Sequence, residues 1–383
     1  MTSDSQSINL LSHVSKEILT LVPYKPGKPI SETQREYGLK EVYKLASNEN
    51  PLGPSPKAVE AIQKAVSSLH LYPDAAAYEL TQAIHKHWKM PTQNIAFGNG
   101  SNEIIDILIR IFCEPGSSIL TSDKAFVAYQ VCAQAARVDV QFSPLDSGFK
   151  VNLKKMGDMI ESSKNPPRIV FIPNPNNPTG TYIPDVEVKA FLERFKNRHE
   201  MLIVFDEAYV EFVRAKDYRP TQDYFGQYAN LLVIRTMSKV YGLAGLRIGV
   251  LLAPQSVIEL YNRVRNPFNI NELAQVAARA ALSDSEFIKK SQRTTWEGLD
   301  FFYKKLSELN LPFLESQGNF VLFDTKRDSS LVNVALLKKG VIMRPVGNYG
   351  MRTHMRLSVG LAHENEIAMR ALREVLSEIP EEK

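Results

Sequence analysis

The stretch that decides the fold spans residues 236–249 and reads Thr-Met-Ser-Lys-Val-Tyr-Gly-Leu-Ala-Gly-Leu-Arg-Ile-Gly. Apolar runs flank it at 230–234 and 248–252, and both runs are typical of buried strands. Lys239 therefore lies just past a strand end, where open α/β sheets bind their ligands. A lysine in such a crevice is neutral part of the time, which makes it a nucleophile towards an aldehyde. Most lysines on loops are simply solvated, and that alternative stays open.

The same stretch carries groups that suit a phosphate ester. Thr236 and Ser238 offer hydroxyl donors, and Arg247 offers a planar guanidinium fork. A ligand with an aldehyde for the lysine and a phosphate for these donors suggests pyridoxal 5′-phosphate (PLP). The stretch by itself leaves an ordinary glycine-containing loop as the alternative.

Composition predicts a globular protein of about two domains. The 383 residues are 44% hydrophobic and 23% charged, and Lys and Arg (46) exceed Asp and Glu (42) by only four. This balance gives no indication of binding to nucleic acid or to an anionic membrane. The chain shows neither an apolar run long enough for a membrane span nor the pattern of a signal peptide. Cys113 and Cys132 lack metal-ligand spacing, so we expect buried reduced thiols, no metal and a cytoplasmic protein.

Helices and short apolar strands alternate between about residues 75 and 255. This alternation predicts a mostly parallel sheet covered by helices. A long helix at about 284–309 marks the crossing into a second, smaller domain, whose strands we expect at 319–323, 341–344 and 354–359. Prolines prevent regular structure in much of the first 46 residues. We therefore expect an irregular N-terminal arm (1–46), a large domain (47–283) and a small C-terminal domain (284–383).

The expected strand at 94–97 leads into a Gly-Asn-Gly turn at 98–100. Ser101 or Asn102 is then expected to cap a helix whose first N–H groups would cradle a phosphate, although an ordinary turn is also possible. Phe126, on a loop after the next strand, can either pack in the core or stack on a flat ring.

Polar side chains also follow the expected strands at 168–172 and 201–205. Asn177 lies in a rigid turn of prolines and asparagines after the first of these strands. Asp206 and Tyr209 follow the second. A carboxylate at such a position usually caps a helix, but it could equally keep a pyridine nitrogen protonated. Together with Lys239, these strand ends supply an aldehyde trap, a ring-nitrogen partner and donors for a ring hydroxyl oxygen.

Two arginines of the second domain, Arg344 and Arg356, lie at or near strand ends. Surface arginines are usually only solvated. Two of them beside Asn319 could bind an anionic substrate.

Several short motifs link the chain to one known family: Ser-Asn-Glu-Asn-Pro-Leu-Gly-Pro at 47–54, Leu-Tyr-Pro-Asp at 71–74, Asn-Asn-Pro-Thr-Gly at 176–180, Asp-Glu-Ala-Tyr at 206–209, Ser-Lys at 238–239 with Arg247, Pro-Phe-Asn at 267–269, and Arg-Leu-Ser-Val-Gly at 356–360. On these motifs the chain resembles the fold type I PLP-dependent aminotransferases, and within them the histidinol-phosphate aminotransferases, nearly from end to end. The resemblance implies an α/β fold, with a mostly parallel seven-stranded sheet in the large domain and a smaller α/β C-terminal domain.

The resemblance also implies a role for each candidate residue. Lys239 would form the Schiff base with PLP and move the substrate proton, while Asp206 would pair with the pyridine nitrogen. Asn177 and Tyr209 would bond the ring hydroxyl oxygen, and Phe126 would stack on the ring, where many relatives carry Tyr. The residues expected to hold the phosphate are Ser101, Asn102, Thr236, Ser238 and Arg247.

The comparison with the family also indicates one unusual residue and one residue that would act in a second chain. Asn102 stands where the family usually has Asp or Glu. Tyr72 would reach the phosphate in the neighbouring subunit, which implies an obligate homodimer with shared active sites. The residues expected to line the substrate pocket are Tyr24, Asn48, Asn319, Arg344 and Arg356.

The implied reaction is transamination between glutamate and imidazole-acetol phosphate, giving 2-oxoglutarate and L-histidinol phosphate in histidine biosynthesis. An aromatic amino-acid aminotransferase and a threonine-phosphate decarboxylase are alternatives on the same scaffold. A PLP-binding regulator is a third alternative, from a different class. It would need a DNA-binding module, for which the 46-residue arm is too short and irregular.

Overall fold

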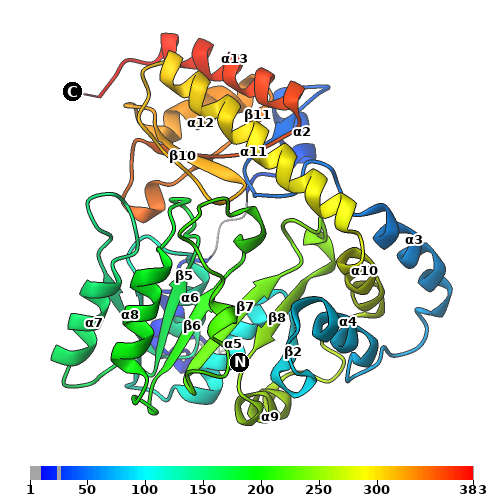
Figure 1. Ribbon diagram of the computed structural model, residues 1–383. Coiled ribbons are helices and arrows are strands. Elements are labelled where there is room, and N and C mark those ends of the chain that lie inside the picture. Colours follow the sequence, from blue (N-terminus) through cyan, green and yellow to red (C-terminus); the bar gives the residue numbers. More distant parts are fainter. Residues whose placement is uncertain (1–9, 24–26, 383) are drawn as a thin grey trace, which may run out of the picture.

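The computed structural model, which describes residues 10–23 and 27–382, has a seven-stranded sheet at its centre (Figure 1). Its strands are β2 (Ile95–Asn99), β3 (Ser118–Ser122), β4 (Asp139–Ser143), β5 (Ile169–Pro173), β6 (Leu202–Asp206), β7 (Leu231–Thr236) and β8 (Ile248–Leu252). The strand order is β2-β8-β7-β6-β5-β3-β4. Every neighbouring pair is parallel except those of β8, which runs antiparallel to both β2 and β7. This is the mostly parallel sheet that the alternating pattern predicts.

Helices cover both faces of this sheet, which explains why β5, β6 and β7 are buried along their whole length. Alternate strand residues point to opposite faces and join separate hydrophobic clusters. One face packs against α5 (Ser101–Phe112), α6 (Ala128–Ala135) and α9 (Gln255–Val264). The other face packs against α4 (Tyr78–Trp88) and α10 (Glu272–Leu282) at its β2 end, and against α7 (Leu153–Ser162) and α8 (Asp185–Phe195) at its β4 end. The helix α3 (Pro56–Ala65) lies outside α10 (Figure 1).

The C-terminal part has a sheet of its own. The antiparallel strands β9 (Phe313–Leu314), β10 (Phe320–Asp324), β12 (Arg344–Pro345) and β13 (His354–Ser358) take the order β12-β13-β10-β9. Side chains of β9, β10 and β13 share a hydrophobic cluster with α11 (Ser285–Glu308), α12 (Ser329–Lys338) and α13 (Ala362–Glu378). The expected long helix at 284–309 corresponds to α11, with Asp284 as its N-cap. In Figure 1, α11 runs from the large sheet up to this second sheet.

The expectation of one strand at 341–344 is wrong, because two short strands replace it. β11 (Val341–Ile342) pairs in parallel with β1 (Tyr43–Lys44), whereas β12 pairs with β13 at the edge of the second sheet. Pro345 has no N–H to donate, so it is tolerated only at such an edge.

The described part of the N-terminal arm is more regular than its prolines suggest. It contains α1 (Lys16–Leu19) and α2 (Ile30–Tyr37) as well as β1. Pro29 lies at the N-cap of α2, where its missing N–H costs nothing, and Gly38 ends the helix with a φ of 67°. Through β1 and β11, the arm joins the C-terminal part of the chain.

None of the helices in the described part of the chain has both the length and the hydrophobicity that crossing a membrane requires. Cys113 and Cys132 are free thiols, as expected, but both are half-buried rather than buried. Burial still raises the pKa of Cys113 to about 11 and that of Cys132 to about 12, so neither is a thiolate near neutral pH.

Candidate active site

A cavity of about 310 Å³ opens at the carboxyl ends of β5, β6 and β7. Parallel strands bring the residues that follow them to one edge of the sheet. The cavity also borders the start of α5 and the segment before α3. The predicted site residues that line it are Asn48, Ser101, Asn102, Phe126, Asn177, Asp206, Tyr209, Thr236, Ser238, Lys239, Arg247 and Arg356.

Lys239 extends from the turn after β7 into this cavity. Its Nζ lies 3.4 Å from the carbonyl oxygen of Ser47 and 5.6 Å from the centre of the Tyr209 ring. Desolvation lowers the pKa of Lys239 to about 8, and the positive charge of Arg356 adds to this effect, against the opposing pull of Glu49. A substantial fraction of the amine is therefore neutral, and hence nucleophilic, in mildly alkaline solution.

Asp206, the last residue of β6, is held by two donors. The Tyr129 hydroxyl donates to its Oδ2 at 2.8 Å, and the Ala208 N–H donates to its Oδ1 at 3.2 Å. Burial raises the pKa of Asp206 to about 6, although the bond from Tyr129 opposes the shift. A buried carboxylate of this kind is stabilised as an anion by a nearby cation, and a protonated pyridine nitrogen would supply one.

Tyr129 is a site residue that the sequence reasoning missed. It lies on α6, where its ring stacks on Phe171 of β5 with centroids 4.9 Å apart. A tyrosine on an apolar helix is indistinguishable in sequence from a core residue. The one available signal is its position three residues after Phe126, which places both rings at the start of α6, edge to face at 5.9 Å.

The start of α5 lies against the guanidinium of Arg247. Gly100 is the N-cap, and Ser101 and Asn102 are the first two helical residues, so the expectation that one of these two caps the helix is wrong. The physical reason is steric, since Gly100 has a φ of 78° and an added Cβ would collide with Arg247. Gly249 likewise has no room for a side chain, because the backbone of Gly100 lies against it.

This arrangement fits a phosphate group. A helix N-terminus attracts anions through its unpaired N–H groups, and Arg247 adds a full positive charge beside it. Thr236 and Ser238 bring hydroxyls to the same cavity, and the Ser238 N–H donates to Thr236 Oγ1 at 3.1 Å, which shapes the turn. Hydroxyls, a guanidinium and a helix N-terminus form a donor set suited to a phosphate ester.

Arg356 lies opposite, on β13 of the second sheet. Its guanidinium donates to Asn177 Oδ1 and, at 2.6 Å, to the carbonyl oxygen of Ala46. Its central carbon also lies 5.3 Å from the centre of the Phe320 ring. Both oxygens are neutral acceptors, and Arg356 itself lines the cavity.

Two predicted substrate residues take part mainly in bonds within the protein. The Asn48 amide donates to the Tyr209 hydroxyl at 2.9 Å and accepts from the Ser358 hydroxyl at 2.7 Å. Asn319 is buried behind it and donates to the Asn48 carbonyl oxygen at 3.0 Å. These bonds make Asn48 and Asn319 supports of the cavity wall.

Two further predicted residues, Arg344 and Tyr72, do not line this cavity, and a third is not described. Arg344 lines a neighbouring hollow together with Val22 and Val131. Tyr72 is 82% exposed and stacks on Phe268, with ring centroids 4.6 Å apart. Tyr24 lies outside the described residues.

Residues 40–372 match the family model described as aminotransferase class I and II. The chain belongs to this family. A histidinol-phosphate aminotransferase of Bdellovibrio bacteriovorus is 59% identical over 96% of this chain and 99% of its own. One from Anaeromyxobacter sp. is 43% identical over 95% and 99%. The crystal structure of histidinol-phosphate aminotransferase from Sinorhizobium meliloti in complex with PLP has a TM-score of 0.88 at 25% identity, over 97% of this chain and 100% of that chain.

The aminotransferase is therefore a PLP-dependent enzyme with the fold type I architecture. The predicted family, fold class and cofactor are confirmed. The cavity suits that cofactor, because a lysine with a lowered pKa, a buried carboxylate and a helix start that fits a phosphate border one space of about 310 Å³.

Proposed function

We propose that this aminotransferase transfers an amino group between glutamate and imidazole-acetol phosphate, forming 2-oxoglutarate and L-histidinol phosphate in histidine biosynthesis. The observation that carries the substrate assignment is that Arg356 lines the same cavity as Lys239, in a chain 59% identical to a named histidinol-phosphate aminotransferase. The assignment of individual roles below is part of the same proposal.

Each residue of the cavity then has a task. When bound, PLP supplies an aldehyde for the lysine amine and a ring that accepts the electrons left when the substrate loses its Cα proton. Lys239 holds and moves that proton, and Asp206 keeps the ring nitrogen protonated. Tyr209 and Asn177 bond the ring hydroxyl oxygen. The residues that hold the ring and the phosphate are Phe126, Ser101, Asn102, Thr236, Ser238 and Arg247.

The two substrates demand an unusual anion site. Glutamate carries a carboxylate on its Cα, whereas histidinol phosphate carries a phosphate ester on that side and no carboxylate. An arginine fork binds either group, because both present two oxygens at similar spacing. Arg356 is therefore assigned to the α-carboxylate in one half-reaction and to the phosphate in the other. Tyr24, Asn319 and Arg344 would assist it; Arg344 pairs with Arg356 between β12 and β13, although it lines the neighbouring hollow.

The test compares kcat/KM for histidinol phosphate with that for phenylalanine and tyrosine, in wild type and in Arg356→Lys. Lysine keeps the charge but loses the bidentate geometry, so both half-reactions should weaken together by about 1–3 kcal/mol, the scale of a charged hydrogen bond. If phenylalanine or tyrosine is the better substrate of the wild type, the assignment fails and an aromatic aminotransferase takes its place.

The same proposal includes a homodimer that shares its active sites. Tyr72 does not line the cavity of its own chain. It stacks on Phe268, and these two rings and the neighbouring Leu71 are exposed apolar side chains. Exposed apolar groups of this kind are typical of interaction surfaces. In the dimer, Tyr72 would reach the phosphate bound by the second chain.

The proposal also covers the division of the chain into domains and its cellular location. We infer three parts, 1–46, 47–283 and 284–383. Leu45 shares a hydrophobic cluster with side chains between Leu299 and Leu376, which supports packing of the arm on the small domain. Packing of the arm on the dimer partner is part of the proposal. The free thiols of Cys113 and Cys132 suit a reducing compartment, which supports a cytoplasmic location.

A further inference from the structure

The segment 46–50 connects the two sheets at the edge of the cavity. The Ala46 carbonyl oxygen accepts from Arg356 of β13 at 2.6 Å. The Asn50 amide donates to the Val240 carbonyl oxygen and to the Ser291 hydroxyl, both at 2.9 Å. The segment therefore binds the strand that carries Arg356 on one side and the turn that carries Lys239 on the other.

At the middle of this segment, a chain of hydrogen bonds joins Ser358, Asn48 and Tyr209. The Asn48 N–H donates to Ser358 Oγ at 2.9 Å, and the Ser358 hydroxyl donates to Asn48 Oδ1 at 2.7 Å. The Asn48 amide then donates to the Tyr209 hydroxyl at 2.9 Å. All three residues are buried, with 3%, 1% and 4% of their surface exposed, so water does not compete for these bonds.

The Ser358 hydroxyl orients the Asn48 amide. Its oxygen accepts from the Asn48 N–H, and its single proton is donated to the amide oxygen of Asn48. The amide NH₂ must then face Tyr209, so the Tyr209 oxygen is an acceptor in this pair. The Tyr209 proton is consequently directed to a different acceptor, and Tyr209 lines the cofactor cavity.

We propose that Ser358 is a positioning residue, which acts through Asn48 to orient the Tyr209 hydroxyl proton towards the ring oxygen of the cofactor. This inference rests on the proposed function, in which Tyr209 donates to that oxygen. Ser358 lies two residues beyond Arg356 on β13. The strand that presents the substrate's anion site thereby also controls a hydrogen bond to the cofactor ring.

Removing the Ser358 hydroxyl releases the constraint on the amide. With Ser358→Ala, the Asn48 side chain can turn its oxygen towards Tyr209 and accept the proton that the ring oxygen otherwise receives. The ring oxygen carries negative charge, and a donated hydrogen bond stabilises it. Without the hydrogen bond from Tyr209, the bound cofactor's ring oxygen would be less stable as an anion, so a proton held between it and Lys239 Nζ would be lost at higher pH.

The test is a pH titration of the visible absorption of the PLP-loaded enzyme, with no substrate present. The variants are Ser358→Ala, Ser358→Thr, Tyr209→Phe and the double variant Ser358→Ala with Tyr209→Phe. We expect the midpoint to rise by about one pH unit in Ser358→Ala, as the loss of one hydrogen bond to a charged oxygen implies. Ser358→Thr retains a hydroxyl and should titrate like the wild type.

The double variant separates positioning from a general packing defect. If Ser358 acts through Tyr209, then Ser358→Ala has no further effect once Tyr209 is Phe, so the two shifts do not add. Three results overturn the inference: an unshifted midpoint in Ser358→Ala, an equal shift in Ser358→Thr, or additive shifts in the double variant.

If Ser358→Ala does not fold, Asn48→Asp takes its place in the same comparison. A carboxylate cannot donate a hydrogen bond to Tyr209, and Asp tolerates the φ of 55° at this position. The charge that Asn48→Asp adds also moves the titration midpoint when Tyr209 is replaced by Phe. The inference is therefore supported only if Asn48→Asp moves the midpoint further with Tyr209 present than with Phe in its place. The titration needs only bound cofactor. A failure of the substrate assignment would therefore leave it unaffected, and the two failures are distinguishable.

Discussion

At the scale of single residues, Lys239 and Asp206 are opposite charges in one cavity, and burial acts on both. It lowers the pKa of the lysine to about 8 and raises that of the aspartate to about 6, because a low-dielectric surrounding favours the neutral form of each. The two shifts serve different tasks. In the proposed roles, the lysine loses its charge to attack an aldehyde, whereas the aspartate keeps its charge beside a cationic partner.

The rate at which cofactor-free protein captures PLP should follow the ionisation of Lys239. Below its pKa the amine is mostly protonated and unreactive, so the rate should rise with pH and level off above about 8. Stopped-flow absorption from pH 6 upward would measure it, with N-acetyl-lysine as the control for titration of PLP itself. A rate that continues to rise to about pH 10, as expected for an exposed lysine, would contradict the role of burial.

Asp206→Asn should retain PLP but lose turnover. The amide has the same shape and can still bond Tyr129, but it carries no charge to keep the ring nitrogen protonated. We expect kcat to fall by about 10²–10³-fold, the range for the loss of one buried electrostatic partner, with little change in bound cofactor. Near-normal turnover at full cofactor occupancy would remove Asp206 from this role.

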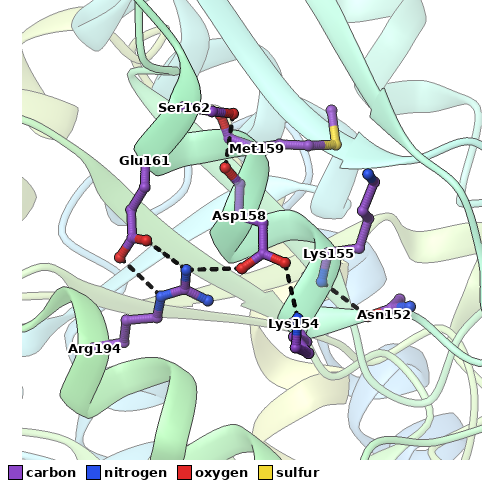
Figure 2. A network of polar contacts seen from close by, with 8 residues as sticks. All are labelled: Asn152, Lys154, Lys155, Asp158, Met159, Glu161, Ser162 and Arg194. Carbon is purple, nitrogen blue, oxygen red and sulfur yellow. Dashed lines mark hydrogen bonds and ion pairs between the residues drawn. The ribbon is translucent and has the colours of Figure 1, made fainter.

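At the scale of elements, the helices that cover the sheet are joined by polar contacts far from the cavity residues. Figure 2 shows one such network, in which Arg194 of α8 bonds Asp158 and Glu161 of α7, and Lys154 bonds Asp158 along the same helix. Gly157 allows the close approach, because an added Cβ would meet the Arg194 guanidinium. The hydrogen bonds from Arg194 lower the pKa of both carboxyl groups.

Arg194→Ala should reduce stability slightly and leave activity unchanged. Exposed ion pairs contribute little, so we expect the melting temperature to fall by no more than about 4 °C at pH 7. Both carboxyl pKa values are lowered in the folded state, so the stabilisation is present above their unfolded pKa values and is lost as the pH falls through the folded ones. The difference from the wild type should therefore shrink in acid.

The matched control is Lys154→Ala. The Lys154 side chain is 85% exposed and belongs to the same network, so its loss should shift the melting temperature less than that of Arg194. Calorimetry at several pH values tests this order. Equal effects of the two substitutions, or a loss of activity in Arg194→Ala, would contradict it.

At the scale of the whole molecule, the cavity is bordered by pieces from both ends of the chain. Segment 46–50 passes between Arg356 on β13 and the turn after β7, and β1 pairs with β11. Closing the site therefore requires the N-terminal and C-terminal parts to fold together. The proposed dimer adds Tyr72 of the second chain to this set.

Mixing two inactive variants tests the shared site. Lys239→Ala lacks the lysine, and Tyr72→Ala lacks the residue proposed to act in the other chain. In a heterodimer of the two, one site has both residues intact. We expect activity to recover towards about a quarter of the wild-type value after random exchange of subunits, since half of the dimers contain one intact site. An absence of recovery after verified exchange would place Tyr72 within its own chain.

Much of the large sheet was predictable, because its information is local. Buried strands such as 230–234 and 248–252 are continuous apolar runs, and a parallel sheet places whatever follows its strands at one edge. From this, Lys239 and Asp206 were expected near each other before any coordinates, and the family and cofactor that they suggested are confirmed. The individual roles of the site residues stay predictions.

The sequence by itself determined which groups stand at the strand ends, since periodicity and turn residues are properties of neighbouring positions. Only the tertiary structure decided what those groups contact. Asn48 meets Tyr209 and Ser358 across 161 and 310 positions of the chain, and Tyr129 reaches Asp206 across 77. No local pattern encodes such pairs, because they depend on how two sheets and the segment between them pack. The same packing sends Val341–Ile342 to β1 and separates them from Arg344–Pro345, a division that the apolar run does not reveal.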